Sequence, residues 1–208
     1  MKTLTELIVP AKSAVIVVDV QNDFCRAEGV LGKLGQPTAA AMEMIPDLQR
    51  LLAAARASGT PVIFVKTIHE AATDSDAWTW RLPSGSVCCL KNTWGAESTE
   101  VAPLPDEPVV IKHRYSGFIN TRLDSVLRTL KIENLIMTGV ATNLCVESTA
   151  RHGYMLDYHI VFLSDCTAAY SMEEHEGSLY NMRMHFGVVA TAGDVIAAWN
   201  AVPALTPT

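Results

Sequence analysis

Short runs of apolar residues alternate along the chain with longer stretches in which apolar residues recur at helical spacing. The apolar runs predict strands at residues 14–19, 61–67, 107–112, 134–140, 158–165 and 187–190. The amphipathic stretches predict helices at residues 38–59, 121–131, from about 143, at 173–186 and at 192–199. Strands that are apolar at nearly every position are buried on both faces. We therefore expect an α/β fold of three layers, with a mostly parallel sheet between helices.

The region from residue 68 to about 107 breaks this alternation. It is rich in Trp, Ser, Gly, Pro and Asp, which is typical of an irregular surface loop region. The sequence shows no internal repeat, low-complexity tract or composition shift that would mark a second domain. Residues 1–208 are therefore expected to form a single domain.

Composition and charge narrow the kind of ligand. The 208 residues are 49% hydrophobic and 18% charged, and the formal net charge is −6 without any Lys/Arg-rich run. These values disfavour nucleic acid and anionic membranes as partners and favour a small neutral or mildly polar molecule. No apolar run reaches membrane-spanning length, and residues 1–13 lack the apolar core of a signal peptide. We expect a cytoplasmic protein whose five cysteines, an odd number, are reduced.

The candidate chemistry lies where the predicted strands end, because open parallel sheets bind ligands at the carboxyl ends of their strands. Asp19, Lys112 and Cys145 follow three of these strands, and Asp165 with Cys166 follows a fourth. The first turn, "DVQNDF", has no glycine, and neither a P-loop nor a G-x-S-x-G motif occurs. Hydride and phosphoryl chemistry are disfavoured, and no cofactor is predicted.

Cys145 has the most suggestive local context. In "IMTGVATNLCVEST" an apolar strand passes through Gly139 and small residues into a helix. If Asn143 caps that helix, Cys145 lies in its first turn, where unpaired N–H groups favour thiolate and can bind an oxyanion. The alternative is a small apolar core residue, which is the usual role of a free cysteine. Cys166 lacks such a turn and is interpreted as a packing residue.

Four motifs, "VIVVDVQNDF", "VVIKHRYSGF", "TGVATNLCVESTARHGY" and "VFLSDCTAA", together resemble the isochorismatase-like cysteine hydrolases over nearly the whole chain. The resemblance implies a six-stranded, mostly parallel sheet and a catalytic set of Asp19, Lys112 and Cys145. It also implies oxyanion donors at the backbone N–H groups of Ala141 and Cys145, with a cis peptide between Val140 and Ala141. Among the branches, "RYSGFINTRLDSVLR" is most similar to ureidoacrylate amidohydrolases, with biuret and N-carbamoylsarcosine hydrolases nearby.

Asp19 and Lys112 also have interpretations without a catalytic role. Asp19 would then cap a turn, and Lys112 would be a solvated residue at a strand end. Their joint position at one sheet edge favours catalysis instead. The hypothesis is that Asp19 takes the thiol proton and later delivers it to leaving ammonia, while Lys112 orients the carboxylate. A Cys–His pair is the rival, but His113 alternates to the face opposite Lys112, and His152 lies about two turns beyond Cys145.

A metal site is not expected. Some relatives, such as nicotinamidases, carry an Asp-x-His ligand set after the second strand, whereas this chain reads "VKTIHEAATDSD" there. A lone His69 with Glu70 is a poor metal site, so we interpret His69 as a surface histidine and predict metal-free catalysis.

The irregular region and the segment "HRYSGF" supply candidates for the substrate pocket. Asn92 and Tyr115 suit a polar ligand, and Arg81 or Arg114 suits a substrate carboxylate. Trp78, Trp80 and Trp94 are weaker candidates, since loop aromatics also serve packing or a subunit interface.

These features predict a homo-oligomeric, metal-independent cysteine amidohydrolase that cleaves a C–N bond of a small ureido or amide compound. Three alternatives stay open. They are a nicotinamidase-like amidase, a vinyl-ether hydrolase of the isochorismatase type, which needs no thiol, and a catalytically silent binding protein. The third is expected to lack a member of the Asp–Lys–Cys set, and all three members are present.

Overall fold

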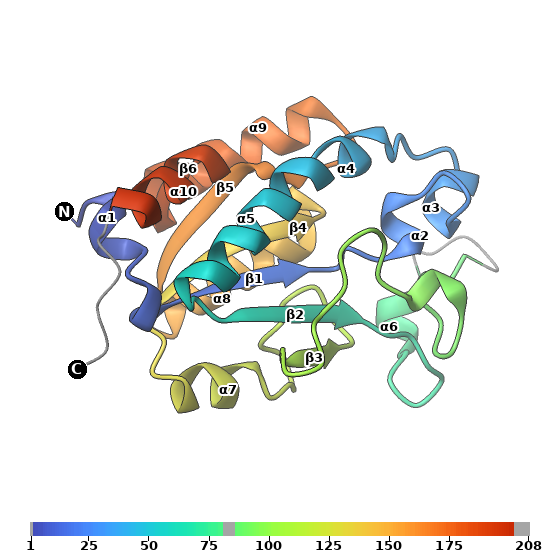
Figure 1. Ribbon diagram of the computed structural model, residues 1–208. Coiled ribbons are helices and arrows are strands. Elements are labelled where there is room, and N and C mark those ends of the chain that lie inside the picture. The colour runs from blue at the N-terminus through green and yellow to red at the C-terminus, as the bar shows by residue number, and fades with distance from the viewer. Residues whose placement is uncertain (1, 81–85, 202–208) are drawn as a thin grey trace.

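A six-stranded sheet forms the centre of the computed structural model, which describes residues 2–80 and 86–201 (Figure 1). The strand order is β3-β2-β1-β4-β5-β6, and every described pairing between these strands is parallel. The strands are β1 (Ser13–Val18), β2 (Val62–Thr67), β3 (Val109–Lys112), β4 (Asn134–Val140), β5 (His159–Ala168) and β6 (Gly187–Ala190). The prediction of an α/β fold with a mostly parallel sheet is confirmed.

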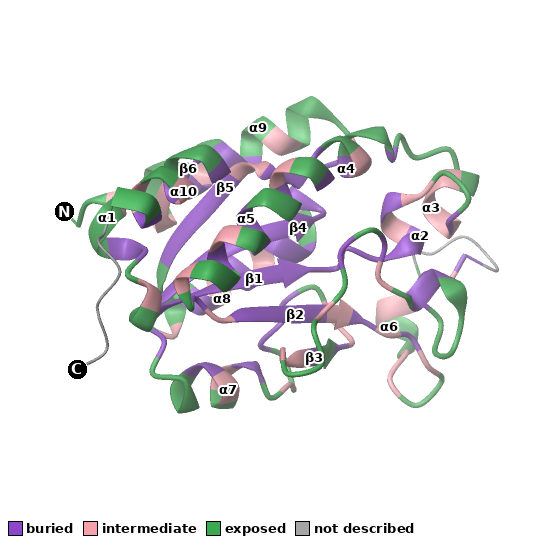
Figure 2. Ribbon diagram, viewed as in Figure 1, coloured by how far each residue is buried: buried purple, intermediate pink, exposed green. Residues whose placement is uncertain are grey.

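Helices cover both faces of the sheet. The α-helices are α1 (Leu4–Leu7), α2 (Asn22–Cys25), α3 (Val30–Lys33), α4 (Ala39–Glu43), α5 (Ile45–Ser58), α6 (Asp76–Thr79), α7 (Leu123–Thr129), α8 (Glu147–Met155), α9 (Met172–Asn181) and α10 (Ala192–Ala201). Single turns of other helix types are η1 (Pro10–Lys12), η2 (Trp94–Ala96), η3 (Thr142–Val146) and η4 (Met182–Phe186). Helices α1, α4, α5 and α10 pack on one face, and α7, α8 and α9 pack on the other. The central strands β1 and β4 are fully buried between them, and β2 is nearly so, whereas the edge strands β3 and β6 are partly exposed (Figure 2). None of the described helices is long and apolar enough to cross a membrane.

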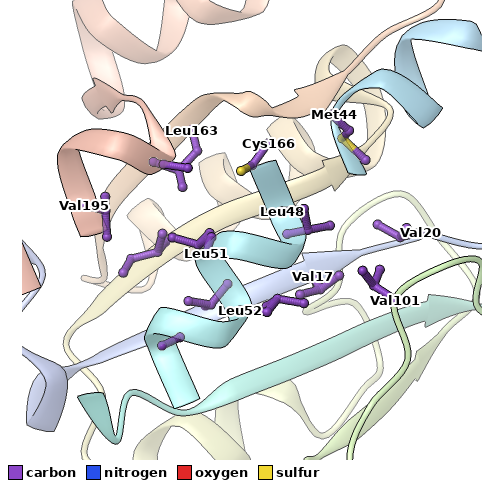
Figure 3. Close-up of a cluster of buried hydrophobic side chains, with 14 of the residues drawn as sticks. Val17, Val20, Met44, Leu48, Leu51, Leu52, Val101, Leu163, Cys166 and Val195 are labelled. Carbon is purple, nitrogen blue, oxygen red and sulfur yellow. The ribbon is translucent and has the colours of Figure 1, made fainter. Parts of the chain in front are cut away.

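Helix α5 shows why the predicted helix at 38–59 is two helices. Pro46 lacks an N–H group and its ring would clash with the preceding turn, so α4 ends at Glu43 and α5 begins with Pro46 in its first turn. Leu48, Leu51, Leu52 and Ala55 then recur at helical spacing, are buried, and pack on the sheet (Figure 3). Gly59 ends α5 in the left-handed conformation with φ 74°.

Strand β5 extends past the predicted boundary at residue 165. A register irregularity opposite Met137 and Gly139 lets the strand continue to Ala168, so Asp165 and Cys166 lie within it and not at its end. The Asp165 carboxylate accepts the Ala192 N–H at the start of α10. Cys166 is buried in the apolar cluster under α5, as Figure 3 shows. Both residues therefore serve the fold, and the interpretation of Cys166 as a packing residue is confirmed.

The irregular region is anchored by three polar side chains that follow β1. Gln21 Nε2 donates to the carbonyls of Thr67 and Ala96, and Asn22 Nδ2 donates to the Trp94 carbonyl. Asp23 Oδ2 accepts the Cys89 N–H at 2.7 Å. Part of this region is therefore buried and is not a surface loop. It lies next to the carboxyl ends of the strands.

Candidate active site

The carboxyl ends of β1, β2, β3 and β4 meet around a cavity of about 170 Å³. Asp19, Thr67, Lys112 and Cys145 line it from these four ends. An apolar part of the wall comes from Phe24, Leu31, Val140, Leu144 and Tyr170. A small cavity with few polar groups at one end suits a small, partly apolar ligand.

Asp19 leaves β1 in an unusual backbone conformation. Its φ of 53° is rare for a residue with a side chain, and it turns the carboxylate toward the neighbouring strand ends. Oδ1 accepts hydrogen bonds from the Thr67 N–H at 2.8 Å and the Thr67 hydroxyl at 2.9 Å. Oδ2 forms an ion pair with Lys112, 2.7 Å from Nζ. This buried carboxylate oxygen also faces the Cys145 thiol and can take its proton.

Lys112 is a fully buried cation, only 1% exposed at the end of β3. Its Nζ donates to Thr67 Oγ1 at 2.6 Å and to Cys145 Sγ at 3.3 Å. Burial favours the neutral amine, but the adjacent Asp19 carboxylate and the Cys145 sulfur reverse this effect and raise the pKa of Lys112 above its ordinary value. Lys112 therefore stays protonated and presents a fixed positive charge to both partners.

Cys145 lies beside these two groups and is 8% exposed. Burial raises the pKa of the Cys145 thiol, the Asp19 carboxylate raises it further, and Lys112 lowers it by less. Burial and the Asp19 carboxylate thus favour the thiol, in the opposite direction to the effect expected of the helix terminus. A nucleophilic sulfur formed from this thiol requires proton transfer to an adjacent base, and Asp19 is that base.

The turn that carries Cys145 also differs from the expected cap. Ala141, not Asn143, precedes the helical segment, and Asn143 lies inside the π-turn η3 without a capping hydrogen bond. The Ala141 carbonyl accepts the N–H groups of Leu144 at 3.1 Å and Val146 at 3.2 Å, and the Cys145 N–H between them is not bonded to it. Such π-turns are frequent at functional sites.

The entry to this turn requires a glycine. Gly139 has φ 110°, and a Cβ at this position would lie 1.9 Å from the Val18 carbonyl oxygen. The peptide bond between Val140 and Ala141 is cis, as the resemblance implies. Ala141 and Cys145 both line the cavity, so the structure brings the two expected oxyanion donors to the same place.

Thr67 and Gln21 contribute to the site but were not among the residues predicted from the sequence. The Thr67 hydroxyl donates to Asp19 and accepts from Lys112, and Gln21 Oε1 accepts the Thr67 N–H at 2.9 Å. A signal was available, because Thr67 ends the predicted strand at 61–67 just as Asp19 and Lys112 end theirs.

The outer wall of the cavity contains an aromatic and basic cluster. Trp78 packs edge-on against Tyr115 with ring centroids 4.7 Å apart, and the Arg114 guanidinium lies 5.1 Å from the Trp78 ring centre. All three residues line the cavity, together with His69. His69 is only 6% exposed, so its interpretation as a surface histidine is wrong; the imidazole packs under Trp78 and contacts Asp74.

The other pocket candidates have different positions. Asn92 is exposed on a turn with φ 64° and is not among the residues that line the cavity. Arg81 lies outside the described residues. Trp78, expected to be a weaker candidate, is in the wall.

Neither rival base contacts the sulfur. His113 Nδ1 lies 2.8 Å from the Ile68 carbonyl oxygen, and His152 Nδ1 lies 3.0 Å from Ser116 Oγ. Within residues 2–80 and 86–201 there is no group of three or more His, Cys, Asp and Glu residues that could hold a metal ion.

Comparison with known proteins gives consistent results. The isochorismatase domain matches residues 13–194. A ureidoacrylate amidohydrolase, RutB, from Pseudomonas syringae pv. syringae is 34% identical over 93% of this chain and 86% of its own, and one from Agrobacterium fabrum is 35% identical over 89% of both chains.

Solved structures agree with these sequence matches. A cysteine hydrolase from Pseudomonas syringae pv. phaseolicola superposes with a TM-score of 0.84 at 31% identity, covering 92% of this chain and 94% of its own. N-carbamoylsarcosine amidase from Thermoplasma acidophilum gives a TM-score of 0.70 at 26% identity, covering 87% and 96%. Nicotinamidase PncA from Bacillus subtilis gives a TM-score of 0.72 at 26% identity, covering 86% of this chain and 99% of its own.

Proposed function

The chain belongs to the isochorismatase family, and from that premise we propose that it is a metal-independent cysteine amidohydrolase acting on a small ureido compound. The ureidoacrylate amidohydrolases that match nearly its whole length support a ureido substrate. One observation carries the proposal: a buried thiol lies 3.3 Å from the Lys112 ammonium, which in turn lies 2.7 Å from the buried Asp19 carboxylate.

The first half of the reaction forms a covalent intermediate. The thiol proton moves to Asp19 Oδ2 as Cys145 Sγ attacks the carbonyl carbon, and the oxyanion receives hydrogen bonds from the N–H groups of Cys145 and Ala141. The C–N bond then breaks, and the proton on Asp19 passes to the leaving nitrogen, which departs as ammonia. Lys112 keeps its positive charge and holds both the carboxylate and the sulfur in place.

The second half restores the enzyme. A water molecule attacks the acyl carbon and gives a proton to Asp19, the C–S bond breaks, and that proton returns to the sulfur. The products are the acid of an amide substrate or the carbamate of a ureido substrate. Asp19 thus alternates as base and acid.

Two alternatives fit less well. A nicotinamidase of the metal-bearing kind requires a ligand set near His69, and the described residues there offer only the pair His69 and Asp74. A vinyl-ether hydrolase has no need of a buried thiol between a carboxylate and an ammonium.

The substrate is proposed to be an N-carbamoyl acid, with Arg114 binding its carboxylate. In a screen of ureido compounds and primary amides, ammonia release is expected to be fastest for N-carbamoyl acids. Arg114→Met is expected to raise KM for these acids by about 10- to 100-fold, because a charge-assisted hydrogen bond contributes about 1.5–3 kcal/mol.

The control for this prediction is Arg128→Met, an exposed arginine on α7 whose side chain pairs with Asp124. It is expected to leave KM unchanged. If nicotinamide or a simple aliphatic amide is hydrolysed fastest, the ureido assignment fails, although the cysteine mechanism can stand.

Metal removal provides a separate test. Dialysis against a strong chelator is expected to leave the rate of ammonia release unchanged, since the described residues offer no cluster of metal ligands. Metal analysis of the purified protein accompanies the assay. Activity that is lost on dialysis and restored by zinc, manganese or iron would refute metal-free catalysis.

We further propose that the chain works in the cytoplasm as a homodimer or homotetramer. The five cysteines are all free, which suits a reducing compartment. Light scattering coupled to size-exclusion chromatography measures the assembly directly.

A further inference from the structure

His69 and Asp74 form a polar pair in the wall of the cavity that the proposed mechanism does not use. His69 Nδ1 lies 2.8 Å from Asp74 Oδ1, and both side chains are largely buried. His69 follows β2 by two residues and lines the same cavity as Cys145. A buried histidine held by a carboxylate at the edge of a substrate cavity has a defined orientation and a free nitrogen to present.

The backbone and the neighbouring ring hold this histidine in place. The His69 N–H donates to the Cys89 carbonyl and the His69 carbonyl accepts the Lys91 N–H, each at 3.0 Å. The Trp78 ring stacks on the imidazole with an interplanar angle of 18°. The backbone of His69 is therefore fixed, and rotation of the imidazole would break its contacts with Asp74 and Trp78.

The carboxylate also determines which nitrogen carries the proton. An ionised carboxylate only accepts hydrogen bonds, so Nδ1 bears the hydrogen that it donates to Asp74. In the neutral imidazole Nε2 is then an acceptor, and within the described residues it has no hydrogen-bond partner.

Other side-chain acceptors in the cavity are engaged, exposed or, in the case of Asp19, used for proton transfer. The Thr67 hydroxyl serves Asp19 and Lys112, the Tyr170 hydroxyl donates to the Phe24 carbonyl, and Tyr115 is 45% exposed. By contrast, the indole N–H of Trp78 is a buried donor without an acceptor among the described residues. Apart from Asp19, which the reaction uses for proton transfer, the wall thus offers donors at Trp78 and Arg114 and an acceptor at His69.

We propose that His69, oriented by Asp74, accepts a hydrogen bond from the internal N–H of the substrate's ureido group and so selects N-monosubstituted ureido compounds over N-methylated ones. The inference rests on the proposed function. A ureido group has two nitrogens, and the terminal one leaves as ammonia with the proton from Asp19. The internal N–H needs its own acceptor when it leaves water, since an unpaired buried donor is costly.

The test compares N-carbamoylglycine with N-carbamoylsarcosine. The two compounds differ only at the internal nitrogen, which carries a hydrogen in the first and a methyl group in the second. Ammonia release is measured at pH 8 for the wild type, His69→Phe, His69→Gln and Asp74→Asn. Phe keeps a ring against Trp78 and removes the acceptor, whereas Gln keeps an acceptor oxygen. His159→Phe, the same change at an exposed histidine remote from the cavity, is the matched control.

The wild type is expected to prefer N-carbamoylglycine by about tenfold in kcat/KM, the scale of one hydrogen bond to a neutral group. His69→Phe is expected to raise KM about tenfold for N-carbamoylglycine alone, which brings the ratio close to one. His69→Gln and Asp74→Asn are expected to give intermediate ratios, and the control to keep the wild-type ratio. A wild-type ratio near one, or an equal loss for both compounds in His69→Phe, overturns the proposal.

Further measurements distinguish failure of the His69 proposal from misfolding of a variant and from failure of the ureido function. If His69→Phe does not fold, the ratios of His69→Gln and Asp74→Asn decide the matter. If the wild type releases ammonia from neither compound, the ureido function has failed by itself. Calorimetric binding of both compounds to Cys145→Ala protein, with and without His69→Phe, then shows directly whether His69 discriminates between them; equal affinities refute the proposal.

Discussion

Cys145→Ala and Cys145→Ser are expected to reduce ammonia release by about 10⁴-fold or more while leaving the fold intact. The reaction loses its nucleophile, and single losses of a nucleophile in comparable catalytic sets have effects of this size. Serine keeps nearly the same volume, but its hydroxyl is a far weaker acid than a thiol, so Asp19 cannot generate a nucleophile from it. Activity assays paired with circular dichroism and thermal unfolding separate the chemical effect from a folding defect.

Alkylation provides an independent measurement of the same residue. Cys25, Cys89 and Cys166 are fully buried, and only Cys88 and Cys145 line the cavity. Burial raises the pKa of both thiols, but Cys145 lies beside the Asp19 carboxylate that takes its proton and the Lys112 ammonium that stabilises the thiolate. Peptide mapping after limited treatment with iodoacetamide is expected to find Cys145 modified first. Preferential alkylation of Cys88 or Cys166, or an inactive Cys166→Ala control, would remove the basis for the assignment.

Asp19→Asn and Lys112→Met are each expected to reduce kcat by about 10³- to 10⁴-fold, and the double variant to lose far less than the product of the two. The residues act as a unit, because Lys112 has its catalytic value only through the carboxylate and sulfur that it holds. The assay compares kcat for both single variants and the double variant with that of the wild type. Independent, multiplicative losses would contradict a shared mechanism.

The same variants are expected to couple in stability. Each single change leaves one fully buried charge without its partner, which costs about 3–5 kcal/mol in comparable buried pairs. The double variant removes both charges, and its free energy of unfolding is expected to lie above that of Lys112→Met. Urea denaturation of all four proteins measures this. If the double variant is the least stable, the ion pair contributes more than the burial of its charges costs.

The alternation of strands and helices in the sequence was enough to predict the α/β fold and the position of the candidate catalytic residues. Apolar runs of strand length alternating with amphipathic helices leave few arrangements other than a parallel sheet between helices, because both faces of each strand must be buried. In such a sheet the carboxyl ends lie at one edge. Asp19, Lys112 and Cys145, each at a predicted strand end, therefore had to come together, and a local pattern was enough to locate them.

The end of strand β5 depended on long-range contacts that the local hydrophobic pattern does not show. The register irregularity between β4 and β5 extended β5 through Asp165 and Cys166, and this pairing joins segments about 30 residues apart. Pro46, in contrast, acts locally, and its presence explains the break between α4 and α5.

Only the tertiary structure decided the electrostatics and the wall of the site. The protonation state of Cys145 follows from its burial beside Asp19, and burial is a property of the packed molecule, not of the helix that follows β4. His69 and Trp78 came into the wall, and Asn92 stayed outside it, because the side chains of Gln21, Asn22 and Asp23 fasten the irregular region to the sheet edge. These contacts join residues more than 60 positions apart, so neither periodicity nor composition could reveal them.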